Sequence, residues 1–392
     1  MKIIHITPYF LPTIGGAQLG LYNLCRYLEK EGIKQYIIAP KRNKSEKSYE
    51  KMDNIKVYRY APNKILRYSN IVLSKISGNI IPEQHIEGVF KTIRLIENEN
   101  IDIIHMHYFR NTSILGYLAK KKFKIPVVIE LMGDDIYDPV YPVPENLWRY
   151  YYPKILNNCD VITAVSNFVG NVIYEKTGIK AEIIPYGVDT NIFKPFDAQI
   201  DYIQEKYNLS KKDKIVIAVQ RLEPRKKVQV LLYAAKKVID EVSNVKFLII
   251  GDGPDRDNLE RLTKKLGISR NIIFTGVIPD KELIKCYSLA DIFSIHTLHE
   301  GLGIVFLEAM AMGLPIVTTY AHGNEDIIEN GKNGFMVEPN NPDKLAEKII
   351  YLLNNEEIRR KIGKLNRKEA VEKYDWKNIA RRVQNIYEMV LK

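Results

Sequence analysis

The sequence lacks the features that mark secreted and membrane-spanning proteins. Its only cysteines are Cys25, Cys159 and Cys286, too few and too scattered for a disulfide framework, which favours a reducing compartment. The apolar runs are far shorter than the ~20 residues that a membrane-spanning helix needs. Pro8 and Pro12 interrupt the first apolar stretch, which makes it a poor secretory signal. We therefore expect a cytoplasmic protein.

Composition and length are those of a folded protein with more than one domain. Hydrophobic residues make up 46% and charged residues 27% of the chain, which excludes a disordered or collagen-like protein. At ~150 residues per domain, 392 residues predict two domains. Short apolar runs alternate with amphipathic stretches, as in βαβ units around parallel sheets. We expect strands at residues 2–6, 35–39, 55–60, 101–105, 127–131, 161–165, 181–185, 214–219, 245–250, 271–274, 291–296, 315–319 and 334–337.

The alternation pauses at residues 191–195 and then restarts, which divides the chain in two. We expect two doubly wound α/β domains, residues 1–192 and residues 196–375. Ligands of such sheets bind outside the carboxyl ends of the strands, and the cleft between two such domains is the expected site. The clearest helical patterns cover residues 17–30, 82–97, 166–177 and 376–391.

The net charge of +11, from 58 basic and 47 acidic residues, needs an explanation. Residues 1–100 hold 16 of the basic and 9 of the acidic side chains, so most of the surplus lies at the N-terminal end. Basic proteins attract nucleic acid, anionic membranes or phosphorylated small molecules, although a solvated lysine-rich surface is the simpler explanation. We expect no nucleic-acid partner, because the sequence has no recognised reading module and no cluster of aromatic stacking platforms.

Two motifs follow expected strands and suit a phosphate. Gly15 and Gly16 precede the helix at 17–30, where free N–H groups and the helix dipole favour anions; a plain strand-to-helix turn is the alternative. After the strand at 214–219 come four cations, among them Arg221 and Lys226. Neighbouring cations repel one another unless they share an anion, and both side chains suit a phosphate. An exposed basic loop is the alternative there.

A third motif combines carboxylates with a glycine turn. Glu300 and Glu308 flank Gly301 and Gly303, which open an apolar helix. The turn exposes N–H groups for a phosphate, and Glu308 could accept both hydroxyls of a ribose. A lone carboxylate in an apolar helix is expensive to bury without partners, so a place on the solvated edge of the helix is the alternative.

Four features, taken in order, resemble the family-four glycosyltransferases of the GT-B fold: Gly15-Gly16, Arg221 with Lys226, the E-x7-E pair Glu300/Glu308, and the Gly323-Asn324 turn. Members of that family are retaining, nucleotide-sugar-dependent enzymes with two Rossmann-like domains. The resemblance extends over nearly the whole chain. The family's final helix usually returns to the N-terminal domain, which implies that residues 376–392 complete it.

The resemblance implies a role for each matching residue. Arg221 and Lys226 would clamp the donor diphosphate, Glu300 would contact the transferring sugar, and Glu308 would hold the ribose. His107 and Asp135 would lie near the acceptor or the sugar. The donor-binding cradle would further include the residues of the glycine turns: Gly15, Gly16, Gly301, Leu302, Gly303, Ile304 and Val305. In the family's usual mechanism a donor phosphate oxygen takes the acceptor's proton, so no enzymic nucleophile, metal or cofactor is expected.

Several positions depart from the family pattern. Gln220 and Lys227 stand where glycines are usual, and His322 replaces a glycine before Gly323. Met132 replaces the histidine of a His-Gly-x-Asp motif and cannot accept a proton. These changes affect expected acceptor contacts more than donor contacts.

One further pattern could bind a metal. His105 and His107 alternate along a strand and could act as ligands. No third ligand has suitable spacing near them in the sequence, so we expect no metal site.

The expected reaction moves a hexose or N-acetylhexosamine from a UDP- or GDP-linked sugar to a glycan or lipid-linked acceptor. An epimerase or hydrolase of nucleotide sugars with the same fold is the alternative. Residues 64–76 mix apolar and cationic side chains and, with Lys120–Lys124, could rest on anionic lipid at the inner face of the cell membrane. An ordinary helix packed on the sheet explains the same pattern equally well.

Overall fold

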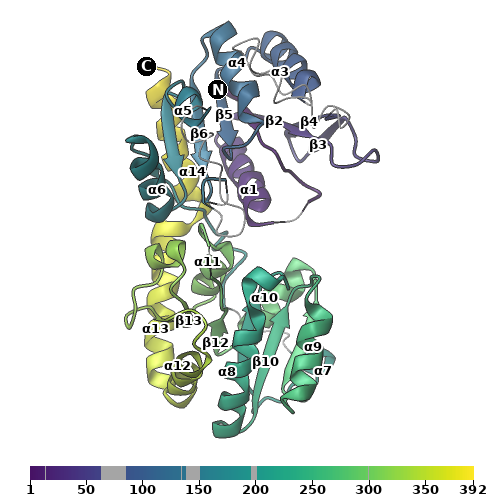
Figure 1. Ribbon diagram of the computed structural model, residues 1–392, viewed down its shortest axis with the longest axis vertical. Coiled ribbons are helices and arrows are strands. Elements are labelled where there is room, and N and C mark those ends of the chain that lie inside the picture. The colour runs from purple at the N-terminus through teal and green to yellow at the C-terminus, as the bar shows by residue number, and fades with distance from the viewer. Residues whose placement is uncertain (14, 63–84, 134, 138–150, 196–200, 299) are drawn as a thin grey trace. The chain divides into compact units, whose positions relative to one another are not determined.

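The computed structural model describes residues 1–13, 15–62, 85–133, 135–137, 151–195, 201–298 and 300–392. The chain forms two compact units, one of Met1–Tyr186 with Trp376–Lys392 and one of Gly187–Asp375 (Figure 1). The boundary at residue 187 thus precedes the linker expected at 191–195. Each unit holds one mainly parallel sheet with helices, which confirms the α/β class of the chain.

The first unit is built on an eight-stranded sheet in the order β3-β4-β2-β1-β5-β6-β7-β8. All neighbouring strands are parallel except β3 and β4. The strands are β1 Lys2–Ile6, β2 Lys34–Pro40, β3 Tyr49–Met52, β4 Ile55–Tyr60, β5 Ile103–His107, β6 Val127–Leu131, β7 Val161–Ala164 and β8 Glu182–Ile183. The helices are α1 Gly16–Lys30, α3 Ile86–Glu99, α4 Ser113–Phe123, α5 Tyr152–Leu156, α6 Asn167–Thr177 and α14 Trp376–Val390.

The second unit is built on a six-stranded parallel sheet in the order β11-β10-β9-β12-β13-β14. Its strands are β9 Lys214–Val219, β10 Val245–Ile250, β11 Ile272–Gly276, β12 Ile292–Ser294, β13 Ile316–Thr319 and β14 Gly334–Val337. Its α-helices are α7 Asp201–Lys206, α8 Val228–Glu241, α9 Arg256–Lys265, α10 Asp280–Leu289, α11 Ile304–Ala311, α12 Pro342–Asn354 and α13 Glu356–Glu369. Three short segments complete it: the 3₁₀ turns η3 Pro224–Lys226 and η4 His322–Asp326, and the π-helical η5 Ala370–Tyr374.

Local sequence explains where these elements lie. The inner strands are apolar on both faces because helices cover both sides of a parallel sheet; β10, for example, buries almost every side chain. Ser166 caps the N-terminus of α6, where its hydroxyl accepts the Val169 N–H. Asn341 caps α12 in the same way, and proline occupies the first position of that helix. Helix α14, the yellow helix of the first unit in Figure 1, packs against α1.

Two strand predictions were wrong in detail. Strand β5 runs from Ile103 to His107 and not from 101 to 105, because its pairing with β6 continues to His107. Strand β3 was missed because its sequence is polar; it is the antiparallel edge strand and buries no side chain fully. The segment expected at 64–76 and the start of the helix expected at 82 lie outside the described residues. No helix in the described part of the chain has the length and apolarity to span a bilayer.

Candidate functional site

The strand order of the second unit fixes where a ligand is expected. Strands β9 and β12 are neighbours, yet the chain continues from β9 to β10 on one side and from β12 to β13 on the other. Such a topological switch point is where open α/β sheets bind ligands, outside the carboxyl ends of the strands. The basic motif directly follows β9 and the E-x7-E motif follows β12, so both reach this edge of the sheet.

The structure brings the two motifs together in an ion pair. Lys226, at the end of the turn η3, donates to the Glu300 carboxylate with Nζ 2.5 Å from Oε2, although 74 residues separate them. Both side chains are largely buried, with exposed fractions of 12% and 21%. The pair therefore places one cation and one carboxylate side by side at the switch point.

Arg221 and its neighbours form a second charged group. Glu223 binds Arg221 through Oε1 at 3.0 Å and Arg225 through Oε2 at 2.8 Å. The Arg221 side chain is 60% exposed. Exposed ion pairs contribute little to stability, so Arg221 can exchange Glu223 for another anion at small cost.

Close backbone packing shapes the glycine turn ahead of α11. A Cβ on Gly323 would lie 1.9 Å from the carbonyl oxygen of Gly301, and the Gly323 N–H donates to the Glu300 carbonyl. Gly303 is the N-cap of α11 and has no side chain to cap it. The first N–H groups of α11, those of Ile304 and Val305 among them, have no acceptor within the helix. They suit an anion, whereas the Leu302 side chain is buried in the core.

Glu308 lies on α11, one turn beyond these amides, and is partly buried. Its Oε2 accepts a hydrogen bond from the Tyr287 hydroxyl at 3.0 Å. Burial raises the pKa of Glu308 to about 7, which the bond from Tyr287 opposes. The carboxylate thus has a partner and does not lie on the solvated edge of the helix.

Sequence reasoning missed several polar groups near the same edge. Gln220 follows β9 directly and is buried, and neither atom of its amide has a hydrogen-bond partner among the described residues. His296, just beyond β12, accepts the Asn340 N–H at Nε2, and burial lowers its pKa to about 4 against the effect of a backbone hydrogen bond with Lys226. Buried polar groups are usually satisfied, so the Gln220 amide is available to a ligand. The sequence shows that polar residues follow these strands, but it does not show that their side chains are buried.

The first unit has its own switch point, between β1 and β5. After β1 the chain reaches Gly15, the extended N-cap of α1, and Gly16 opens that helix. No acidic residue lies in the first turn of α1 and no side chain caps it. An anion could therefore bind the free N–H groups there.

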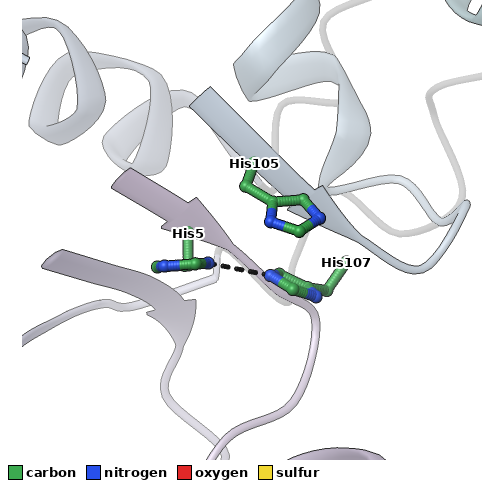
Figure 2. A group of neighbouring side chains, drawn as sticks. All are labelled: His5, His105 and His107. Atoms are coloured by element: carbon green, nitrogen blue, oxygen red, sulfur yellow. Dashed lines mark hydrogen bonds between the residues drawn. The ribbon is translucent and has the colours of Figure 1, made fainter. Parts of the chain in front are cut away.

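His107, at the end of β5, belongs to a buried histidine network (Figure 2). Its Nε2 lies 2.9 Å from His5 Nδ1, and its Nδ1 lies 2.7 Å from Glu130 Oε2. Burial lowers the pKa of His5 to about 3 and holds that of His105 well below its usual value. No third possible ligand lies near His105 and His107 in the sequence, but β1 brings His5 beside them in the fold.

The Asp135 carboxylate is buried and bound by the protein's own backbone. Its buried carboxylate accepts the backbone N–H groups of Phe109, Met132 and Gly133 at 2.7, 3.1 and 2.8 Å. It thereby orders the loops that follow β5 and β6. This geometry favours a positioning role over the sugar contact that the sequence suggested.

Comparison with known families identifies the chain. Residues 14–192 match the family model described as Glycosyltransferase Family 4, and residues 199–369 match Glycosyl transferases group 1. The chain belongs to glycosyltransferase family four.

Individual relatives agree with this assignment. The chain is 29% identical over 338 residues to N-acetyl-alpha-D-glucosaminyl L-malate synthase of Bacillus anthracis, covering 83% of this chain and 86% of that protein. It is 28% identical over 316 residues to GDP-mannose-dependent alpha-(1-6)-phosphatidylinositol monomannoside mannosyltransferase of Mycolicibacterium smegmatis, covering 78% and 81%. The chain is therefore a glycosyltransferase.

Solved structures confirm the GT-B fold of this family-four enzyme. Sucrose-phosphate synthase from Thermosynechococcus elongatus superposes with a TM-score of 0.82 at 19% identity, covering 99% of this chain and 98% of that one. Anabaena Alr3699/HepE in complex with UDP gives a TM-score of 0.78 at 19% identity, covering 99% and 100%. At these identities the likeness shows the fold alone.

Proposed function

We propose that this family-four glycosyltransferase transfers a hexose or N-acetylhexosamine from a UDP- or GDP-linked sugar to its acceptor with retention of configuration. The observation that carries the proposal is the Lys226–Glu300 ion pair at the switch point of the second unit. The free amides at the start of α11 and the Glu308 carboxylate follow on the same segment. The cation and the amides suit the diphosphate, Glu300 suits the transferring sugar, and Glu308 suits the ribose.

The ion pair explains how donor binding would assemble the site. An arriving diphosphate carries more charge than a carboxylate and would take Lys226 from Glu300. Glu300 would then be free to accept hydrogen bonds from the hydroxyls of the transferring sugar. Donor binding and sugar positioning are thereby coupled, because Lys226 leaves Glu300 for the diphosphate.

Charge stabilisation would supply most of the catalysis. As the glycosidic bond breaks, negative charge develops on the leaving diphosphate, and fixed donors aimed at that charge lower the barrier. Lys226, Arg221 and the amides of Ile304 and Val305 are such donors. They would replace the divalent ion that neutralises a leaving phosphate in other enzymes, so transfer would need no metal at the diphosphate.

The proton of the acceptor hydroxyl would go to a donor phosphate oxygen. Met132 stands where the family usually has histidine, and a thioether cannot take that proton. A route through the donor itself needs no enzymic base at residue 132. It also places attack on the face that the diphosphate leaves, which retains the anomeric configuration.

Two features favour a lipid-linked acceptor. The mycobacterial relative is by name a phosphatidylinositol mannoside mannosyltransferase. In this chain the last turn of α4 carries Lys121 and, in ion pairs with Asp160 and Glu97, Lys120 and Lys122. Helix α3 carries the exposed Phe90. Cations and an aromatic ring suit an anionic membrane surface. Flotation on anionic vesicles that weakens with salt would support the idea, and equal behaviour with neutral vesicles would refute it.

The first experiment is a thermal-shift panel with UDP, GDP, ADP and their sugars. A ligand well above its dissociation constant raises the stability of the folded chain measurably. The stabilising sugar is then incubated alone and with acceptors, and the anomeric configuration of the product is read by NMR. Consumption of the donor without acceptor would indicate an epimerase or hydrolase, and an inverted product would overturn retention.

A further inference from the structure

Three imidazoles converge in the interior of the first unit. His5 on β1 and His105 on β5 are paired in the sheet register, and His107 lies two residues further on the same face (Figure 2). One ring nitrogen of each lies within 4.8 Å of the other two. All three residues are at least 98% buried. The mechanism proposed above uses none of these nitrogens.

Gln35 determines which nitrogen of His5 carries hydrogen. His5 Nε2 lies 2.6 Å from Gln35 Oε1, and the Gln35 amide is oriented because its Nε2 donates to the Ile33 carbonyl at 2.8 Å. An amide oxygen only accepts, so His5 Nε2 must be the donor. In the neutral ring, His5 Nδ1 is then a bare lone pair that points toward His107.

Glu130 determines the tautomer of His107 in the same way. His107 Nδ1 lies 2.7 Å from Glu130 Oε2 and donates its hydrogen to that carboxylate. His107 Nε2 is then also a lone pair, and it faces His5 Nδ1 at 2.9 Å. Two acceptors cannot bind each other, so an additional proton or a metal ion must lie between them. The additional proton would make one ring cationic, or would protonate Glu130 and reverse the tautomer of His107.

His105 distinguishes the two possibilities. Its Nδ1 is paired with the Tyr387 hydroxyl at 2.7 Å, and its Nε2 is buried with no hydrogen-bond partner among the described residues. A proton shared by His5 and His107 leaves that nitrogen unsatisfied, which is unfavourable for a buried polar group. A metal ion would satisfy all three nitrogens at once.

We propose that His5, His105 and His107 form a binding site for one late transition-metal ion, Zn²⁺ foremost. Imidazole nitrogens are preferred ligands of zinc, with Zn–N distances of ~2.0–2.1 Å. Nitrogens in a tetrahedral site are then about 3.3–3.4 Å apart, so the present spacings need only small ring movements. Gln35, Glu130 and Tyr387 each hold an outer nitrogen, as the outer partners of metal-bound histidines do.

The site has a structural consequence for the C-terminal helix. Tyr387 belongs to α14, so the ion would join β1 and β5 and, through His105, α14. Metal binding adds its free energy to folding when the unfolded chain lacks the site. We therefore expect the ion to stabilise the first unit without taking part in sugar transfer.

The test measures metal directly. The full chain is expressed in zinc-supplemented medium, freed of its affinity tag and analysed by mass spectrometry for metal content. We expect one zinc ion per chain, and growth with cobalt in place of zinc should give the visible absorption of tetrahedral Co²⁺. Two variants are compared: His105→Gln, and His85→Gln as a control, because His85 is also buried in this unit but pairs with Tyr60.

The outcomes show whether a metal ion or a proton lies between His5 and His107. His105→Gln should lose the metal and unfold at a lower temperature, whereas His85→Gln should keep it. A wild-type chain at the background metal level after zinc-supplemented growth would overturn the proposal and leave the shared proton. Full metal content in His105→Gln would overturn it too, even if stability fell. Because the main readout is metal content, failure here is distinguishable from failure of the transfer assay.

Discussion

The Tyr287 hydroxyl donates a hydrogen bond to Glu308 Oε2 at 3.0 Å inside the second unit. Burial raises the pKa of Glu308 to about 7, and the bond from Tyr287 acts in the opposite direction. If Glu308 holds the ribose hydroxyls, it accepts hydrogen bonds from both only when it is ionised. Donor binding then depends on pH close to neutrality.

We expect the dissociation constant of the nucleotide sugar to rise as the pH falls through about 7, approaching ~10-fold per pH unit below that value. Tyr287→Phe removes a bond that favours the ionised form, so its midpoint should lie at higher pH. Titration calorimetry measures both profiles, and a nucleotide sugar serves better than a free diphosphate because its own charge is constant in this range. Glu308→Gln should bind weakly at every pH. A flat wild-type profile would remove Glu308 from the ribose site.

The Lys226–Glu300 pair yields a second prediction. Lys226→Ala should lower kcat by roughly 10²–10³-fold, the usual loss for one charge-stabilising donor. Glu300→Gln keeps the size of the side chain but loses the charge, and should reduce transfer with less effect on donor affinity. The control is Arg225→Ala, the same change of charge one residue away, since Arg225 binds Glu223 at the exposed surface. If Arg225→Ala matched Lys226→Ala, the general charge of the loop and not the pair would matter.

The meeting of Lys226 and Glu300 could be predicted from sequence because both lie in short motifs at strand ends. Lys226 and Glu300 are far apart along the chain, yet parallel topology alone brings the ends of β9 and β12 to one edge. The histidine network could not be predicted, because His5 joins His107 only through the pairing of β1 with β5. Strand β3 was not predicted for a different reason. An edge strand needs no apolar face, and the polar residues of β3 do not show the pattern of a strand.

The backbone N–H groups that surround Asp135 predict that this residue positions two loops. Asp135→Ala would leave three buried N–H groups without their acceptor, and we expect the free energy of unfolding to fall by about 2–4 kcal/mol. Trp376 opens α14 in the first unit, so denaturation followed by tryptophan fluorescence measures this loss. Glu97→Ala, which breaks an exposed pair with Lys122, should cost about 1 kcal/mol or less. An Asp135→Ala chain of normal stability without transfer activity would restore the sugar contact.

The position of the basic motif depends on a glycine in a different loop. Gly251, after β10, has a φ of +130°, and a Cβ there would lie 2.0 Å from the carbonyl oxygen of Gln220, next to Arg221. Gly251→Ala must displace this backbone, so we expect a loss of about 3 kcal/mol or more. Gly267→Ala is the matched control, because φ is +72° there but nothing lies within 4 Å of the new Cβ. Its cost should be the conformational strain alone, about 1–2 kcal/mol.

Calorimetry and donor binding together test that dependence. If Gly251 holds the Gln220–Arg221 backbone in place, Gly251→Ala should weaken nucleotide-sugar binding even at temperatures where the variant is folded. Gly267→Ala lowers stability through strain in a loop after α9, at a distance from the basic motif in sequence, and should leave donor affinity unchanged. Equal losses of stability in the two variants would mean that the backbone around Gln220 moves away from the new Cβ at little cost in free energy. The close approach of the two loops would then have no part in positioning Arg221.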